Sequence, residues 1–301
     1  MSRQRASRVK VMRSRWPTFT EFRSCLWPAV KRISSDQMTD VAAALTYYAV
    51  FSIFPAMIAL ISTLSLIGHG ATDPILESLA DAPGPVSEIL SGVVESASNR
   101  TAGPAFVLGL GVAIWGASGY VGAFARASNR IFDVEDHRSF WKSRPLQLGL
   151  TALLLLLVVV AATASVLTGP IAREAGDMIG LGAEAARTWD RAKVPGVLLT
   201  AALLITLLMR AAPAARFDGM RAVLPGALLT LALWVTSSLA LGVYFAKFAA
   251  YDETYGALAG AVAFLFWLWV SNLAALLGQL VNSELRLAAA ATTSYRPSSS
   301  R

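Results

Sequence analysis

The sequence predicts an all-α, polytopic integral membrane protein with six transmembrane helices and both termini in the cytoplasm. Its composition is the first indication, because only 15% of the 301 residues are charged and the mean hydropathy is +0.55. Soluble globular chains carry roughly 25% charged residues. As readings of the whole chain, a soluble enzyme, a secreted disulfide scaffold and a nucleic-acid-binding domain are therefore excluded.

Long uncharged stretches are the second indication. A helix that crosses the hydrocarbon core needs about 20 largely apolar residues. Five of the six stretches are long enough, and 194–209 becomes so if Arg210 extends its side chain to the headgroups. The stretches are 41–72, 101–125, 145–172, 194–209, 222–246 and 254–283. We expect spans at 41–68, 103–125, 145–170, 194–212, 222–246 and 254–285.

The placement of basic residues is the third indication. Twenty of the 26 Lys and Arg residues lie in 1–40, 126–144, 210–221 and 284–301, which alternate with the other connecting segments. Lys and Arg are enriched in cytoplasmic loops, so these segments are expected on the cytoplasmic side of the membrane. We therefore expect the single cysteine, Cys25, and the terminal Arg301 to face the cytoplasm. The basic charge then reflects topology and contact with membrane lipids, and no nucleic-acid partner is indicated.

Three regions follow from this pattern. Residues 1–40 form a basic cytoplasmic segment, in which apolar residues spaced by three and four predict an amphipathic helix over 18–35 on the inner leaflet. Residues 41–288 form the six-helix transmembrane domain. Residues 289–301 are expected to be a disordered cytoplasmic tail. The outer segment 69–102 is expected to include a short helix.

Polar residues gather in the first and sixth predicted spans. Pro55 removes a backbone hydrogen bond, so it predicts either a bent helix that lines a polar path or a kink needed for packing. In the sixth span, Asn272, Gln279 and Ser283 fall within roughly 40° of one another on a helix. We expect these three side chains to face Ser52 and Pro55 of the first span. They either line a path or make only interhelical hydrogen bonds. The candidate path comprises Tyr47, Tyr48, Ser52, Pro55, Asn272, Gln279, Asn282 and Ser283.

The segment after the second span is a candidate lipid contact. Arg126 and Arg130 lie one helical turn apart, with Asn129 beside them. Two guanidinium groups at this spacing can bind a lipid phosphate. We therefore expect Arg126, Asn129 and Arg130 to contact lipid headgroups.

Catalytic and metal chemistry find little support. Asp133, Asp136 and His137 are potential metal ligands, but the sequence has no second cluster to complete a shell. Acidic groups and ion pairs in an inner loop explain them better. The other histidine, His69, is expected on the opposite side of the membrane. No phosphate-binding loop, HExxH motif or GxSxG motif occurs. We predict no metal, no cofactor and no enzymatic activity.

Four passages, in order, carry a family resemblance. The stretch DQMTDVAAALTYYAVFSIFPAMIALIS, with its Ala-rich start, paired aromatics, Ser and Pro, resembles the first span of the YihY/BrkB family of bacterial inner-membrane proteins. Residues 129–151, residues 224–285 and the order of the spans are also similar. The resemblance covers roughly residues 30–288, and over this range the sequence is most similar to that of actinobacterial members. The matching residues are Tyr47, Ser52, Pro55, Asn129, Trp141, Tyr255, Gly256, Trp267, Gly278, Asn282 and Glu284.

The resemblance implies a six-helix bundle with both termini inside and a role in cell-envelope integrity, including the movement of lipids or other envelope precursors. Family members often carry the name ribonuclease BN, which nothing in this sequence supports. The family usually has a Glu near the end of the last span, where this chain has Leu280. A mechanism that needs a carboxylate at that position is therefore in doubt.

Three functions remain open. The kinked first span and the polar sixth span favour a transporter or flippase for lipid-like or amphipathic envelope substrates. The alternative is a non-transporting scaffold for envelope-assembly proteins, which needs only packed interfaces. An enzyme is disfavoured.

Overall fold

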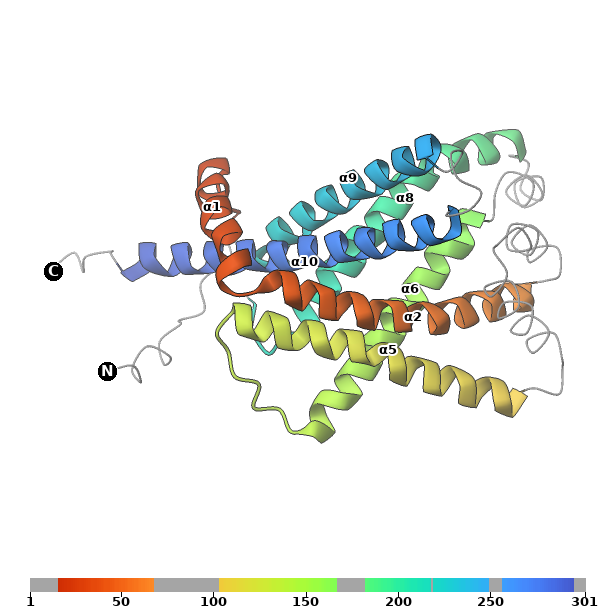
Figure 1. The fold of residues 1–301 in the computed structure, drawn as a ribbon, viewed down its shortest axis with the longest axis horizontal. Helices are drawn as coiled ribbons and strands as arrows, with labels where there is room; N and C mark the ends of the chain where they lie inside the picture. The colour runs from red at the N-terminus through yellow and green to blue at the C-terminus, as the bar shows by residue number, and fades with distance from the viewer. Residues whose placement is uncertain (1–15, 68–102, 167–181, 218, 249–255, 295–301) are drawn as a thin grey trace. The chain divides into compact units, whose positions relative to one another are not determined.

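The computed structural model describes residues 16–67, 103–166, 182–217, 219–248 and 256–294 (Figure 1). These residues form α-helices, one short 3-10 helix and connecting turns, which confirms the all-α prediction. Each of the six predicted spans falls on one helix. The elements are α1 (Phe19–Ser35), α2 (Met38–Ile67), α5 (Gly103–Ile131), α6 (Phe140–Val166), α8 (Gly182–Ala211), η1 (Met220–Ala222), α9 (Leu224–Phe248) and α10 (Gly256–Ser294).

Four helical segments in the described residues are long and apolar enough to cross a membrane. They are Phe140–Ala161, Val194–Ala211, Leu224–Tyr244 and Gly260–Ala291. These segments match the third to sixth predicted spans. The first two spans, the total of six and the side on which the termini lie stay predictions.

Helix α1 matches the amphipathic helix predicted over 18–35. A capping box starts it: the Thr18 hydroxyl accepts from the Glu21 backbone N–H at 3.3 Å, and the Glu21 carboxylate accepts from the Thr18 N–H at 2.7 Å. Cys25 and Ala29 are buried on one face, whereas Trp27 is exposed. Gln37, with a φ of 55°, separates α1 from α2.

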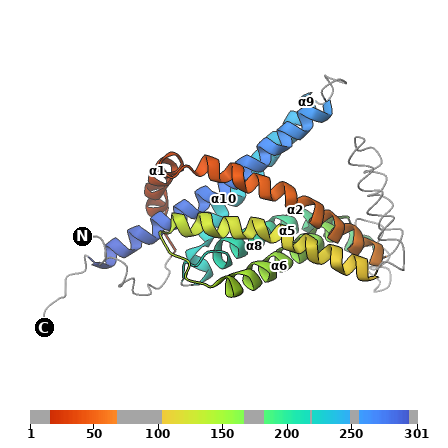
Figure 2. The same ribbon diagram turned by 60° about the horizontal axis from the view of Figure 1, so that its bottom comes forward.

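The helices form two compact units, and each is described by itself. The first comprises residues 1–46, 123–137 and 205–301. In it α9 and α10 lie side by side (Figures 1 and 2), and α1 packs against α10. Gly226 of α9 and Gly278 of α10 meet so closely that a Cβ on either would collide with the carbonyl of the other. Small residues thus allow the two backbones to touch.

The second unit comprises residues 47–122 and 138–204. The Arg144 guanidinium donates to the Ser118 hydroxyl at 3.3 Å and lies over the Trp115 ring at 4.8 Å. Along α6, Leu156 and Val160 are exposed, as expected for a surface that faces lipid.

Most of the helices extend beyond the predicted span limits, and α5, α6, α8 and α10 do so by five residues or more. α6 begins at Phe140 and α8 at Gly182, so Pro145 and Pro195 lie inside helices. α10 continues to Ser294, into the predicted tail 289–301. Charged residues end a membrane span but not a helix, and Ala-rich sequence at 288–291 favours helix continuation.

Several predictions concern residues outside the described ranges. They are the basic residues before Trp16, the surface helix within 69–102, the outer turn at 249–255 and the end of the tail at 295–301. α2 is helical on both sides of residue 55 and through it. The predicted kink there stays a prediction.

Candidate functional site: the polar row of α10

Four polar side chains of α10 are buried in the first unit. We call Asn272, Gln279, Asn282 and Ser283 the polar row; their exposed fractions are 4%, 0%, 2% and 5%. Lipid cannot satisfy the hydrogen bonds of such groups, which therefore face protein or a watery cavity. The sequence spacing predicts a common face for Asn272, Gln279 and Ser283, and the structure buries these three residues and Asn282.

Asn272 connects α10 to the start of α2. Its Nδ2 donates to the Thr46 hydroxyl at 3.1 Å, and that hydroxyl donates to the Ala42 carbonyl at 2.8 Å. Thr46 is itself buried. Asn272 therefore bonds to the first predicted span, about one and a half helical turns before Ser52.

Gln279 joins three helices. Its Nε2 donates to the Ser128 hydroxyl of α5 and to the Met209 carbonyl of α8, both at 3.1 Å. Among the described residues, its Oε1 has no hydrogen-bond partner although the side chain is completely buried. An unsatisfied buried acceptor costs about 1–3 kcal/mol. Gln279 is thus the member of the row with acceptor capacity left for another molecule.

Asn282 caps α9 from the neighbouring helix. Its Oδ1 accepts from the Gly226 N–H at 2.8 Å, and its Nδ2 donates to the Val223 carbonyl at 3.1 Å. The first N–H groups of a helix have no partner within it. The Oδ1 of Asn282 supplies an acceptor for one of these N–H groups, so this side chain has a structural role.

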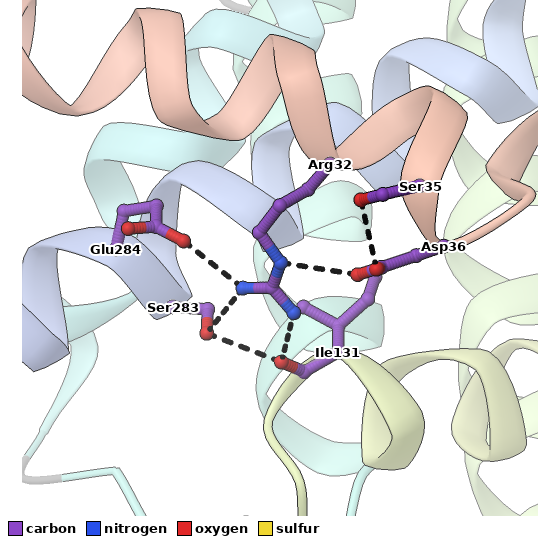
Figure 3. Close-up of polar contacts among 6 residues, drawn as sticks. All are labelled: Arg32, Ser35, Asp36, Ile131, Ser283 and Glu284. Carbon is purple, nitrogen blue, oxygen red and sulfur yellow. Dashed lines mark hydrogen bonds and ion pairs between the residues drawn. The ribbon is translucent and has the colours of Figure 1, made fainter.

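An arginine cluster lies at the end of the polar row (Figure 3). Arg32 of α1 pairs with Asp36 at 3.0 Å and with Glu284 at 3.1 Å, and it donates to the Ile131 carbonyl at 3.0 Å. Ser283 also donates to that carbonyl at 3.2 Å and lies 3.4 Å from Arg32. One guanidinium therefore ties α1 to α10 and to the end of α5.

Sequence reasoning did not single out Arg32. The available signal was the four-residue spacing between Arg32 and Asp36 on a predicted amphipathic helix. The pairing with Glu284 spans 252 residues of sequence. Local patterns do not reveal such a distant contact.

The two arginines after the second predicted span differ from Asn129 in their exposure to solvent. Arg126 and Arg130 are exposed. Asn129 is 7% exposed, and its Oδ1 accepts from the Ala214 N–H at 2.7 Å. Asn129 therefore fixes the turn after α8 and is not open to a headgroup, whereas both arginines are.

The candidates on the first span belong to the second unit. Tyr47 is exposed and its ring lies 4.8 Å from that of Phe51, whereas Tyr48 is half-buried. The Ser52 hydroxyl donates to the Tyr48 carbonyl at 2.8 Å, within its own helix. The side chain of Pro55 lies outside the described residues. That the polar row faces Ser52 and Pro55 stays a prediction.

The acidic segment after α5 is open to solvent. Asp133, Asp136 and His137 are exposed, and His137 Nε2 lies 3.7 Å from the Glu135 carboxylate. In the part of the chain that the structure describes, no three His, Cys, Asp or Glu side chains are grouped to hold a metal.

Cys25 lies on the face of α1 turned toward the protein. Desolvation by burial is the main cause that raises the pKa of its thiol, and the carboxylates of Glu284 and Glu21 raise it further. A hydrogen bond with Ser24 acts in the opposite direction. The thiol is therefore held in its neutral, unreactive form.

Comparison with known proteins gives two matches. The family model described as Virulence factor BrkB matches residues 29–301. The ribonuclease-like protein YfkH of Bacillus subtilis (strain 168) is 27% identical over 245 residues, which are 81% of this chain and 88% of that protein. No solved structure is significantly similar. The family match includes the whole polar row and the arginine cluster.

Proposed function

Because the chain belongs to the BrkB family, we propose that it is an inner-membrane protein of envelope integrity that moves lipid-like or amphipathic substrates. The proposal includes six spans with both termini in the cytoplasm. Family membership confirms the resemblance over residues 30–288. The four apolar helices and the family together indicate a membrane protein.

The observation that carries the proposal is the buried amide of Gln279. Polar side chains within membrane helices are costly and mark substrate pathways. The Oε1 of Gln279 retains an unused acceptor next to the Ser128 hydroxyl. The polar row offers only amides and hydroxyls, which suit the uncharged polar parts of an amphipathic molecule. The carboxylate of Glu284, which follows the row, is paired with Arg32.

A specific observation favours the scaffold as the second candidate. The amide nitrogens of Asn272, Gln279 and Asn282 all donate to groups on other segments. Such bonds are worth roughly 0.6 kcal/mol each in measured membrane proteins. If packing were their entire role, the row would hold the helices together without forming a path.

Replacement of one amide separates the two functions. In a strain that lacks its own copy, Gln279→Leu should abolish envelope function while the protein remains abundant in the membrane. Gln147→Leu is the matched control, because this half-buried residue of α6 lies outside the polar row. The measured quantity is envelope resistance per amount of membrane-inserted protein. Function that falls only in proportion to lost protein would support the scaffold and contradict transport.

A further inference from the structure

Arg144 of α6 carries a charge that no acidic group of the described residues neutralises. Its side chain is half-buried, and its one hydrogen bond within those residues goes to the Ser118 hydroxyl at 3.3 Å. No Asp or Glu in that part of the chain forms an ion pair with it. A guanidinium has five N–H donors, so most of them are left for another molecule or for water.

Arg32 shows how this protein compensates another half-buried arginine. The side chain of Arg32 is 25% exposed, and it pairs with both Asp36 and Glu284. A charge that leaves water is costly unless an opposite charge and hydrogen bonds compensate for it. Arg144 has neither of these two kinds of acidic partner among the described residues, so a bound anion is the group that would compensate its charge.

Three neighbouring side chains hold the guanidinium in place. Its Cζ lies 4.8 Å from the centre of the Trp115 ring and 5.7 Å from the centre of the Phe140 ring. The fully buried Ser118 hydroxyl donates to the Trp115 carbonyl at 2.6 Å, which leaves its oxygen to accept from Arg144. The guanidinium is therefore positioned before a ligand arrives, which lowers the entropic cost of binding. We call Arg144, Ser118, Trp115 and Phe140 the Arg144 site; all four belong to the second unit.

The Arg144 site lies at the surface of the second unit. Trp115 is 53% exposed and Phe140 is 59% exposed. The guanidinium that lies against these two rings is itself only half-buried. A ligand can therefore reach it without a rearrangement of the helices.

The start of α6 also attracts an anion. The N-terminus of a helix carries about half a positive charge, which acidic residues in the first turn commonly balance. The first turn of α6 contains no acidic residue, and Arg144 follows directly after that turn. The helix end and the guanidinium are thus two positive charges close together, and one anion would stabilise both.

The place of Arg144 in its helix indicates where the anion comes from. Arg144 lies close to the start of Phe140–Ala161, a segment apolar enough to cross a membrane. Its contact with the Phe140 ring shows that the side chain extends toward that start, and an arginine near the end of a span reaches the headgroups in this way. The exposed Trp115 and Trp141 are also typical of the membrane interface. Lipid phosphate groups lie at this level and attract basic residues.

We propose that Arg144 binds the phosphate group of an anionic phospholipid through paired hydrogen bonds from its guanidinium. A zwitterionic lipid brings an ammonium group that competes with the guanidinium for the phosphate, so a lipid of net negative charge is favoured. The Arg144 site differs from the candidate lipid contact at Arg126 and Arg130, which belong to the first unit.

The proposal concerns binding alone and does not rest on transport, because a scaffold could hold the same lipid. A failed transport assay would leave it standing. Loss of the lipid from Arg144 would not disprove a path at the polar row.

Native mass spectrometry of the full chain in mild detergent tests the Arg144 site. With equal amounts of phosphatidylglycerol and phosphatidylethanolamine added, the wild-type protein should retain phosphatidylglycerol preferentially. Arg144→Gln should weaken the binding of phosphatidylglycerol at least about tenfold, because hydrogen bonds to a charged group are lost. Arg144→Lys should recover only part of the loss, since an ammonium keeps the charge but cannot form the paired bonds. A wild-type protein without preference, or equal retention by the wild type and Arg144→Gln, overturns the proposal.

Lys142→Gln is the matched control. Lys142 is exposed and lies two residues before Arg144, about 200° around the helix. The variant therefore removes the same charge from the same end of α6 but from another face, and it should bind phosphatidylglycerol as the wild type does. Equal weakening in Lys142→Gln and Arg144→Gln would indicate general electrostatic attraction and overturn the site.

Inorganic phosphate distinguishes a lipid from a free anion. Excess inorganic phosphate should not displace phosphatidylglycerol from the wild-type protein, because the ion lacks the acyl chains that anchor the lipid. Complete displacement would show that the site takes a free phosphate ion and would overturn the assignment to a lipid.

A wild-type measurement covers the case in which Arg144→Gln fails to fold. Phosphatidylglycerol with a photoreactive headgroup should crosslink to Trp115 and Phe140, and excess unlabelled phosphatidylglycerol should suppress the reaction. Crosslinks spread evenly over other exposed residues such as Leu156 and Leu199, without saturation, would indicate ordinary surrounding lipid and overturn the proposal.

Discussion

Alanine at position 278 should push α9 and α10 apart. A Cβ there would lie 2.5 Å from the Gly226 carbonyl oxygen and 2.9 Å from the terminal carbon of Met209, and it would also collide with the Thr230 hydroxyl. Ordinary contacts are 3.4–4 Å, so the helices must separate by about 1 Å. The separation also weakens the bond from Thr230 to the Ala274 carbonyl, now 3.1 Å.

The expected cost follows from these contacts. Overpacking costs about 1–3 kcal/mol, and weakening the hydrogen bonds of Thr230 and Asn282 adds roughly 0.6 kcal/mol each. Alanine recovers about 0.5–1 kcal/mol, since it is the better helix former. The net loss in free energy of unfolding is therefore about 1–4 kcal/mol.

Gly242→Ala is the matched control. Gly242 lies on α9, and a Cβ there meets nothing within 4 Å. This variant should be as stable as the wild type or more stable by up to about 1 kcal/mol. Detergent-solubilised protein titrated with SDS gives the free energy of unfolding for all three proteins. If Gly278→Ala matched the wild type, or if both variants lost equal stability, the close crossing would not be a source of stability.

Three further predictions concern α1 and the acidic segment. Arg32→Lys should speed amide hydrogen exchange in α1, because an ammonium cannot reproduce the fork-shaped bonding of a guanidinium to Asp36, Glu284 and Ile131. The control Arg23→Lys, at an exposed position of the same helix, should leave the exchange unchanged. Equal exchange rates in the two variants would contradict a role of the arginine cluster in holding α1. At pH 7, Cys25 should react with maleimide more slowly than a cysteine introduced at the exposed position 34 in a Cys25→Ala background. The reaction rate of Cys25 should rise only at higher pH, because its raised pKa keeps the thiolate scarce. Equal rates for the two cysteines would contradict the burial of Cys25. Purified protein should not cleave RNA with or without divalent metal, and cleavage that survives purification but is lost in Asp136→Asn would refute this.

The burial of Cys25 also changes how topology should be measured. A single exposed cysteine at position 34 reports the side of the membrane better than Cys25, which is 5% exposed. With Cys25→Ala in the background, a membrane-impermeant maleimide should label this position only after permeabilisation. Labelling in intact cells would contradict a cytoplasmic N-terminus.

The positions of the helices could be predicted because charge is excluded from membrane spans. The helix ends could not, since residues 140–144 and 182–193 carry charge yet continue as helix outside the apolar core. Residue spacing placed three polar side chains of α10 on one face, and the structure buries all three. Their partners could not be predicted, because Ser128 and Met209 lie 151 and 70 residues away from Gln279.

Asn129 shows a second limit of sequence reasoning. It lies between two exposed arginines, and the sequence therefore places it with them at the headgroups. The buried bond to the Ala214 N–H depends on the turn after α8, which no local pattern specifies. The arginine cluster is similar, because it needs α1, α5 and α10 to be assembled before Arg32 meets Glu284.

The most direct test of the proposed function is lipid movement in proteoliposomes. Fluorescent phospholipid in both leaflets is exposed to a membrane-impermeant quencher, with and without an imposed ion gradient. The wild-type protein and Gln147→Leu should make inner-leaflet lipid accessible to the quencher, and Gln279→Leu should resemble empty liposomes. Wild-type vesicles indistinguishable from empty ones under both conditions, or undiminished movement in Gln279→Leu, would contradict a transport path at the polar row.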